Sequence, residues 1–417
     1  MKQNTCGRAC KLSIFFVIFL DMLGVGIVVP VLASLFLDPL KGILPSTFAL
    51  SLKTLLYGLL IAAYPFMQFF GAPILGAMSD RYGRKKVLLV SIAGTLIGDL
   101  IFALGIMLNS IVLLFIGRII DGLTGGNISV ALSAIADVSD EKSKARNFGM
   151  VGMAFGFGLI IGPYIGGLLA NPAIVHWFTS ATPFWFAAIL TVVNIVLLVC
   201  TFPETLLTRI ESKISLLTGF RNISKAFKLS NMRVMFLVIF LLAFGFNFFT
   251  QFVQVYLIEK FQYTEFQIGN FFAFIGFWIA FAQGVVTRPV SKHFSPDKVL
   301  RFAPLLLGMM LALLLLPTKP VYLYFILPFV AIFQGLTFPN STAIISNLSS
   351  RDSQGEIMGI NQSIQSLAQT IPPIIAGLIS SISFSLPIIV ASIITIIAWL
   401  IFMIFYGRKK EEAFHEV

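Results

Sequence analysis

Charged residues, cysteine and histidine are all scarce in this chain of 417 residues. Only 11% of its residues are Asp, Glu, Lys or Arg, whereas 58% are hydrophobic. A soluble protein carries about 25% charged residues, so this chain lacks the polar surface that a soluble body of its size needs. The composition excludes a disordered chain, a collagen, a disulfide scaffold and an ordinary cytosolic enzyme. It predicts an integral membrane protein.

The few cysteines and histidines exclude further classes. The three cysteines lie in a short basic leader and in one apolar run, so no disulfide framework can form. His176, His293 and His415 fall in loops or in the tail, where they form no metal site and no catalytic triad. We therefore expect no metal, no cofactor and no enzyme activity.

Apolar runs of membrane-crossing length follow one another along the chain. A helix needs about 20 residues to cross the hydrocarbon core, and the runs predict twelve such helices. They lie near 12–37, 52–77, 87–108, 111–137, 147–170, 182–202, 234–259, 266–288, 298–316, 321–346, 357–381 and 384–406. The first run is too long for the apolar part of a signal peptide and is expected to be retained. The predicted fold class is an all-α membrane protein with twelve transmembrane helices.

Lysine and arginine are distributed unevenly between the two ends of these helices. The odd-numbered connections carry only Lys41, Lys53, Lys260 and Lys319, and the other basic residues except Arg118 lie at the termini or in the even-numbered connections. Because basic residues favour the cytoplasmic side, both termini are predicted to be cytoplasmic in a cell inner membrane. The net charge of +11 follows from this topology and does not indicate nucleic acid.

The longest polar break, 203–233, divides the chain. It predicts a six-helix half (1–202), a cytoplasmic linker (203–233) and a second six-helix half with a short tail (234–417). An internal repeat relates the halves: Gly122-Leu123-Thr124-x-x-Asn127 recurs as Gly335-Leu336-Thr337-x-x-Asn340, and Pro163-x-x-x-Gly167 recurs as Pro373-x-x-x-Gly377. Repeats of this kind place a substrate site near the bilayer midplane, open alternately to each side.

The loop after the second span has a specific pattern. It reads Gly76-Ala77-Met78-Ser79-Asp80-Arg81-Tyr82-Gly83-Arg84-Lys85-Lys86. Gly76 is expected to let two helices meet closely, and Gly83 permits a sharp turn. An ordinary basic cytoplasmic loop would need only the positive charge, so this spacing indicates more than topology.

Span five contains Gly158-x-x-x-Gly162-Pro163-x-x-Gly166-Gly167, and span one contains Leu20-Asp21-Met22-Leu23-Gly24. Small residues four apart allow backbone-to-backbone packing, which is the general alternative for span five. With the Gly76–Lys86 loop, these segments resemble the motifs of the major facilitator superfamily. The likeness is strongest to its drug:proton antiporters, among them the tetracycline/proton efflux proteins, and it covers all twelve spans. It implies two pseudo-symmetric six-helix halves and a proton-coupled exporter, whereas the substrate does not follow from a fold.

Few ionisable residues lie inside the predicted spans. A charge at bilayer depth costs at least about 2.5–3.5 kcal/mol, so each one is a functional hypothesis. Asp21, Asp99, Arg118 and Asp121 fall in the middle third of the bilayer, all in the first half. The second half is expected to have no buried acid or base, because Glu259 sits at a span edge. We expect the first half to handle protons and the second to recognise substrate through neutral polar groups.

The resemblance implies a role for each of these charges. Asp21 is the first candidate for the proton-carrying carboxyl group, and a permanent ion pair with Arg118 is the alternative. Asp99 falls one position later than the family's acid, which leaves its direction open. Arg118 matches an arginine that tunes proton release, and Asp121 can reach it as an i,i+3 partner. The resemblance also implies a cytoplasmic latch between the halves, formed by Gly76, Asp80, Arg81, Gly83, Arg84 and Asp137.

Polar side chains form stripes at helical spacing in the second half and are the candidates for substrate binding. An interhelical hydrogen bond is the alternative for any one of them, but as stripes they are expected to face water. They are Asn247, Gln251 and Gln254 on span seven, Gln334, Thr337 and Ser341 on span ten, and Asn361, Gln365 and Gln369 on span eleven.

The residues together predict a proton-driven exporter of an amphipathic small molecule, such as a drug or antibiotic. Since three acids face one arginine at the midplane, a cationic or zwitterionic substrate is favoured. A dedicated metabolite or siderophore exporter and a proton-coupled uptake symporter are the alternatives. A receptor or scaffold is disfavoured because the tail 407–417 is short. The expected partners are substrate, protons and the lipid bilayer, with no nucleic acid, and the expected state is a monomer.

Overall fold

The computed structural model describes residues 2–38, 42–45, 47–138, 154, 156–158, 160–206, 217–229, 232–348 and 354–406. Within these ranges every regular element is a helix, as the apolar runs predict. Much of the predicted linker and the whole tail 407–417, with His415, lie outside the described residues.

The helices follow one another with short connections. Their bounds are α1 (Lys2–Leu32), α2 (Ser34–Leu37), α3 (Leu50–Tyr82), α4 (Arg84–Met107), α5 (Ile111–Thr124), α6 (Asn127–Asp137), α8 (Thr182–Thr201), α9 (Thr218–Lys228), α10 (Arg233–Phe261), α11 (Glu265–Phe281), η1 (Ala282–Val286), α12 (Thr287–His293), α13 (Pro296–Leu300), α14 (Ala303–Leu313), η2 (Pro320–Tyr322), α15 (Leu323–Leu348), α16 (Gln354–Ser380), α17 (Leu386–Ile401) and η3 (Phe402–Tyr406). A further apolar helix, Gly156–Leu169, precedes α8.

Eight helical segments of the described chain are long and apolar enough to cross a bilayer. They are Leu12–Leu37, Leu50–Tyr82, Arg84–Met107, Ile111–Ile135, Thr182–Thr201, Arg233–Phe261, Pro320–Leu348 and Leu386–Ile404, and each coincides with a predicted span. The other four predicted spans fall on Gly156–Leu169, on α11 with η1 and α12, on α14, and on α16, which are shorter or more polar.

The predicted span 111–137 is interrupted. Helix α5 ends at Thr124, Gly125 and Gly126 form a turn, and α6 begins at Asn127. Helix α3 passes close to this turn: a Cβ atom added at Gly126 would lie 2.6 Å from the Cα atom of Ala72. The corresponding repeat segment in α15 stays helical throughout, so the break distinguishes the two repeats.

The chain forms two compact units. Unit 1 comprises Met1–Phe48, Ala63–Thr218 and Tyr263–Ala273, and unit 2 comprises Ala49–Ala62, Gly219–Gln262 and Phe274–Val417. Unit 1 therefore includes the start of α11, and unit 2 includes the start of α3. Each of these two helices begins in one unit and ends in the other.

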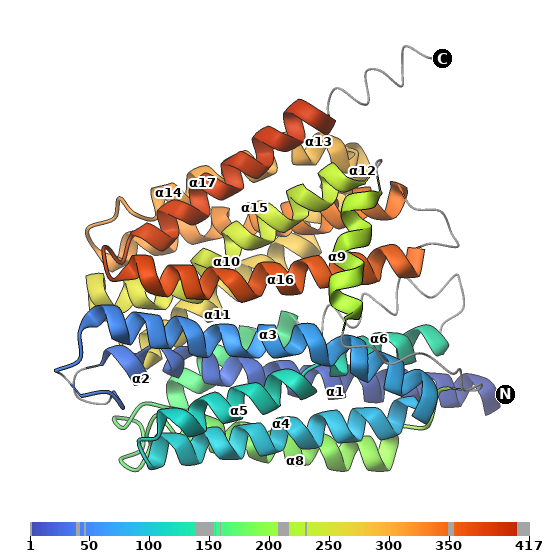
Figure 1. Cartoon of the computed structure of the whole chain (residues 1–417), viewed down its shortest axis with the longest axis horizontal. Coiled ribbons are helices and arrows are strands. Elements are labelled where there is room, and N and C mark those ends of the chain that lie inside the picture. The colour runs from blue at the N-terminus through green and yellow to red at the C-terminus, as the bar shows by residue number, and fades with distance from the viewer. Residues whose placement is uncertain are drawn as a thin grey trace. The chain divides into compact units, whose positions relative to one another are not determined.

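Each unit has its own apolar core. In unit 1, side chains of α1, α3, α4, α6 and α8 bury one another, and α4 packs beside α5 and α8 (Figure 1). In unit 2, the core lies between α10, α15, α16 and α17. Helix α9 crosses α16 (Figure 1), where Asn222 Nδ2 donates to Ser363 Oγ at 3.0 Å. Helix α8 exposes Ile189, Val192, Val193 and Val196 along one side, the apolar surface that a lipid-facing helix needs.

Candidate functional site

The four charges predicted inside the membrane all lie in unit 1. Arg118 Nη1 lies 3.8 Å from Asp121 Oδ2, and the two side chains are 11% and 13% exposed. The Arg118 guanidinium also lies over the ring of Phe102, with its Cζ atom 5.3 Å from the ring centroid. The Phe102 ring stacks on Phe184 of α8 at 4.3 Å. Arg118 is therefore held by its own helix, by α4 and through α4 by α8.

Asp21 has a different environment. Its side chain interacts with Asn127, the first residue of α6, and electrostatically with Asp121. In the described part of the chain, the ion pair of Arg118 joins Asp121. The alternative in which Asp21 is permanently paired with Arg118 therefore has no support from the structure.

Asp99 belongs to the same group of charges. It interacts electrostatically with Asp121, Arg118 and Asp21, and its side chain also interacts with Thr191 of α8. Asp121 in turn interacts with Thr95 of α4. The one-residue displacement of Asp99 therefore leaves it within interaction range of the other three charges.

Tyr64 of α3 was missed by the sequence analysis because it carries no charge. Its hydroxyl interacts electrostatically with Asp121, Asp21, Arg118 and Asp99. Gln68 Nε2, one turn further on, lies 3.3 Å from the Tyr64 hydroxyl and donates to the carbonyl oxygen of Gly125 at 2.7 Å. The sequence feature that could have identified Tyr64 is its spacing of four residues from Gln68, a second polar side chain in an otherwise apolar span.

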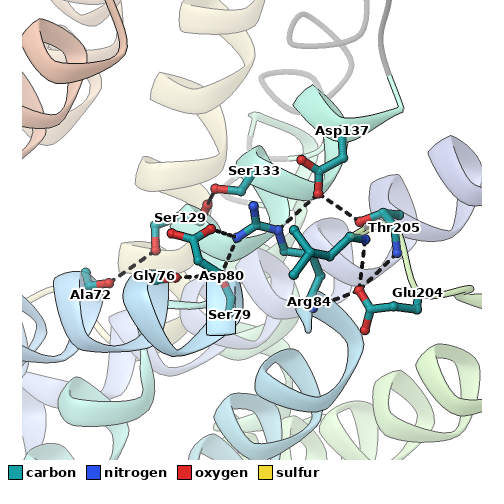
Figure 2. Close-up of polar contacts among 11 residues, drawn as sticks. Ala72, Gly76, Ser79, Asp80, Arg84, Ser129, Ser133, Asp137, Glu204 and Thr205 are labelled. Carbon is teal, nitrogen blue, oxygen red and sulfur yellow. Dashed lines mark hydrogen bonds and ion pairs between the residues drawn. The ribbon is translucent and has the colours of Figure 1, made fainter. Parts of the chain in front are cut away.

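A second group of charges surrounds Arg84 at the end of α3 (Figure 2). Arg84 Nη1 contacts Asp80 Oδ1 at 2.6 Å and Ser79 Oγ at 2.6 Å, and Arg84 Nε contacts Asp137 Oδ2 at 3.0 Å. The Arg84 side chain is only 7% exposed. Gly83 makes the required turn with a φ of 104°, a conformation that glycine adopts without strain.

Glu204 completes this group, although it was predicted only as part of the linker. Its carboxylate accepts a hydrogen bond from the backbone N–H of Arg84 at 2.9 Å (Figure 2). It accepts a second from the backbone N–H of Lys85 at 3.2 Å. It thereby satisfies donors at the start of α4 that no intrahelical carbonyl can reach. Thr205 Oγ1 donates to Asp137 Oδ2 at 3.2 Å. We call Ser79, Asp80, Arg84, Asp137, Glu204 and Thr205 the Arg84 cluster.

The latch roles of Arg81 and Gly76 stay predictions, and the contacts of these two residues differ from those of Arg84. Arg81 is exposed and lies over the Tyr82 ring, 5.4 Å from its centroid, while the ion pairs of this loop are made by Arg84. The expectation that Gly76 lets two helices meet closely is wrong. A Cβ atom added at Gly76 would meet only Ser129 Oγ, at 4.0 Å, which is ordinary van der Waals distance.

The glycine-rich motif of helix Gly156–Leu169 packs against other helices on two faces. Gly158, Gly162 and Gly166, spaced four apart, contact the backbone of α1. A Cβ atom added at Gly162 would lie 2.7 Å from the Cα atom of Gly26, and one at Gly166 would overlap the carbonyl of Ile27. This face binds the helix that carries Asp21.

The other face of the same helix contacts the start of α11. A Cβ atom added at Gly167 would lie 3.0 Å from the Cα atom of Phe266, and one at Gly269 would overlap the carbonyl oxygen of Pro163. Pro163 and Gly167 therefore form a docking face for the α11 segment that belongs to unit 1.

The repeated sequence does the same in unit 2. A Cβ atom added at Gly58 of α3 would overlap the carbonyl oxygen of Pro373 and lie 3.2 Å from the Cα atom of Gly377. Beside this contact, the Tyr57 hydroxyl donates to the carbonyl oxygen of Gln251 at 2.7 Å. The repeat Pro-x-x-x-Gly thus marks the place where each unit holds the start of a helix from the other half of the chain.

The polar stripes of unit 2 are only partly accessible. The expectation that they face water is wrong for Gln254, Thr337, Ser341 and Asn361, which are 3%, 0%, 2% and 5% exposed. The hydroxyl groups of Thr337 and Ser341 donate to carbonyls of their own helix. The half-buried members are Asn247, Gln251, Gln334, Gln365 and Gln369. Of these, Asn247 Nδ2 donates to Ala243 O at 2.8 Å.

Three amide oxygens in unit 2 have no hydrogen-bond partner among the described residues: Gln254 Oε1, Gln334 Oε1 and Asn361 Oδ1. Each is a buried acceptor that is left unpaired, which is uncommon in folded proteins.

The expectation of no buried acid in the second half is also wrong. Glu265, at the start of α11, is 4% exposed, and it escaped notice because it stands at the edge of an apolar run.

The family assignment follows from sequence comparison. The model of the major facilitator superfamily matches residues 14–330 and 281–415. The chain belongs to the major facilitator superfamily. Its predicted fold class is thereby confirmed as an all-α membrane protein with twelve helices in two halves.

Relatives and solved structures agree with this major facilitator assignment. The tetracycline resistance protein of class C from Escherichia coli is 30% identical over 388 residues, which cover 92% of this chain and 92% of that protein. Multidrug resistance protein 2 of Bacillus subtilis is 25% identical over 410 residues, covering 95% of each. The crystal structure of the human organic anion transporter MFSD10 has a TM-score of 0.72 at 23% identity, covering 95% of this chain and 99% of that one.

A D-xylose-proton symporter structure has a TM-score of 0.76 at 14% identity, covering 95% of this chain and 97% of the symporter. Major facilitator proteins move small molecules across a membrane, and the relatives above are transporters rather than enzymes. This chain is accordingly a multi-pass membrane transporter.

Proposed function

We propose that this protein is a proton-coupled exporter of an amphipathic small molecule, and that Asp21 carries the exchanged proton. The observation that carries the proposal is the separation of two environments in unit 1. Arg118 is paired with Asp121, whereas the neighbour of Asp21 is the neutral Asn127. A guanidinium favours the ionised form of a neighbouring carboxyl group more strongly than a neutral amide does, so Asp21 is the less constrained of the two acids.

The cycle is alternating access between the two sides of the membrane. Protonation of Asp21 from outside neutralises its repulsion with Asp121 and favours the conformer that releases substrate outward. Deprotonation toward the cytoplasm restores the conformer that loads substrate. The membrane potential contributes about 2.3 kcal/mol per charge per 100 mV to such a cycle.

The orientation of this cycle rests on the distribution of basic residues. Lys85, Arg84 and the other bases of the Gly76–Lys86 loop are proposed to lie in the cytoplasm, as are both termini, with the protein in a cell inner membrane. The Arg84 cluster is proposed to hold the halves in one of their two arrangements, as the latch of the family does. We propose a monomer, with one half of the chain (1–202) handling protons and the other (234–417) recognising substrate.

The substrate is proposed to be cationic or zwitterionic, because the three acids near Arg118 outnumber the one base. Among the candidate contacts we place Gln334 first. It is half-buried, its Oε1 atom has no partner among the described residues, and it stands at the repeat position of Asp121. A substrate with amine or hydroxyl donors satisfies this oxygen. The names of the relatives suggest tetracyclines or a range of drugs as the compounds to test first.

The test is substrate-induced proton movement in inverted vesicles. The addition of a transported compound should release protons from vesicles that contain the protein, and Asp21→Asn should abolish this release. Asp297→Asn, the same chemical change in the short helix α13, is the matched control and should behave as the parent protein does. Unchanged proton release in Asp21→Asn would remove Asp21 from the mechanism.

A growth panel of toxic compounds separates the remaining alternatives. Protection from many compounds, or from tetracyclines alone, supports a drug exporter. Protection from none directs the search to a metabolite or siderophore exporter, and proton uptake together with substrate would identify a symporter.

A further inference from the structure

Glu265 is a buried acid that the proposed proton pathway does not use. It is the first residue of α11 and is only 4% exposed. Its Oε1 atom lies 3.0 Å from Ser34 Oγ and 3.4 Å from Ser180 Oγ, and the two serines are 5% and 8% exposed. Ser34 begins α2, and Ser180 lies in the connection before α8. One carboxyl group thus joins three elements of unit 1.

Helix capping does not explain this arrangement. An acid in the first turn is favourable near the positive end of the helix dipole wherever it points. The cap itself is made by other residues: the Thr264 N–H donates to Gln267 Oε1 at 2.9 Å, and the Gln267 N–H donates to Thr264 Oγ1 at 3.4 Å. Glu265 instead turns its carboxylate toward hydroxyl groups from elsewhere in the chain.

The surroundings make this contact specific. The backbone of α11 already lies against Pro163 and Gly167 through Gly269, but this packing contact includes no hydrogen bond among the described residues. The hydrogen bonds from the serines to Glu265 are directional, so they fix the orientation of the first turn of α11. Ser34 Oγ also lies 2.8 Å from the carbonyl oxygen of Val31, so its single hydrogen is shared between two acceptors, and Ser180 supplies the second donor to Glu265.

We propose that Glu265 is a positioning residue of the transport cycle. Its hydrogen bonds with Ser34 and Ser180, which we call the pin, hold the start of α11 in unit 1 while the outer side is closed. This rests on the proposed alternating access. Helix α11 continues without a break into residues of unit 2, and in the proposed cycle the opening of the outer side releases its first turn. The bonds to Ser34 and Ser180 break at that step. In unit 2 the start of α3 is held by different groups: the Tyr57 hydroxyl donates to a backbone oxygen, and Lys53 interacts electrostatically with Glu259.

The experiment measures how often the outer end opens. Ala181 adjoins Ser180 and is 4% exposed, so an Ala181→Cys reporter in a background with the three natural cysteines changed to serine is shielded while the pin holds. A membrane-impermeant maleimide is added to right-side-out vesicles, and the labelling rate is compared between variants that purify as monodisperse protein.

Glu265→Ala should raise the labelling rate about tenfold, since it removes two hydrogen bonds to an ionisable group. Ser34→Ala combined with Ser180→Ala should do the same, and this variant keeps the test valid if Glu265→Ala does not fold. Glu265→Gln retains an oxygen that accepts both bonds and should stay within about threefold of the parent. Gln267→Ala, which weakens only the helix cap, is the matched control and should leave the rate unchanged.

The proposal is overturned if Glu265→Ala labels no faster than the parent, if Glu265→Gln labels as fast as Glu265→Ala, or if Gln267→Ala labels as fast as either. The labelling needs neither substrate nor a proton gradient. If Asp21 proves not to couple protons, the labelling experiment can still be interpreted. If the labelling experiment fails, the proposed exporter function is not affected.

Discussion

Replacing Arg84 by alanine tests the Arg84 cluster in unit 1. The guanidinium makes charge-assisted contacts to Asp80 and Asp137 and a hydrogen bond to Ser79 while its side chain is 7% exposed. Removing one member of a fully buried ion pair costs about 3–5 kcal/mol. The two carboxylates here are 36% and 23% exposed, so water compensates part of the loss. We expect a cost of about 3 kcal/mol, at the lower end of that range.

The assay is the thermal unfolding midpoint of the purified protein. For a cooperative unit of roughly 200 residues, 3 kcal/mol corresponds to a fall of about 6–12 °C. Arg84→Lys keeps the charge but cannot bridge two acids, so about half of this fall is expected. Arg81→Ala is the matched control, because Arg81 lies in the same loop and is exposed, and its midpoint should move by less than about 2 °C. Equal shifts for Arg84→Ala and Arg81→Ala would refute the reasoning.

Three further predictions concern single side chains. Gly83→Ala should cost about 1–3 kcal/mol in stability, because φ is 104° and the new Cβ atom would meet the Glu204 carboxylate. Gly166→Ala should lower the yield of monodisperse protein through its overlap with the α1 backbone, whereas Gly156→Ala, with nothing within 4 Å, should not. Gln334→Ala should raise the KM for the exported compound about 2–10-fold and leave the unfolding midpoint unchanged, because its Oε1 atom has no partner among the described residues. A changed midpoint with an unchanged KM would assign Gln334 to packing instead.

Much of the fold could be predicted from the apolar runs and from the signature loop, Gly76–Lys86. Runs of membrane-crossing length gave the positions of the long helices, since lipid tolerates few polar residues over 20 positions. The resemblance to the family's loop implied three members of the Arg84 cluster, namely Asp80, Arg84 and Asp137. The break at Gly125 was not foreseen, because it follows from the close approach of α3, and apolar periodicity continues across it.

The missed site residues share a physical cause. Glu204 and Glu265 find their partners 120 and 231 residues away along the chain, and no local pattern reports such contacts. Tyr64 carries no charge and therefore did not stand out in an apolar span. The repeat of Pro163 and Gly167 in the second half was visible in the sequence, but which helix docks on it depends on tertiary packing.

Substrate counterflow measures the role of Asp21 most directly. Reconstituted vesicles are loaded with unlabelled compound, and the entry of labelled compound is followed without a proton gradient. Asp21→Asn should keep this exchange close to the parent rate while it loses accumulation driven by an imposed gradient, because the moving parts remain and only the proton carrier is gone. Loss of both activities together, or retention of gradient-driven accumulation, would contradict the assignment of proton coupling to Asp21.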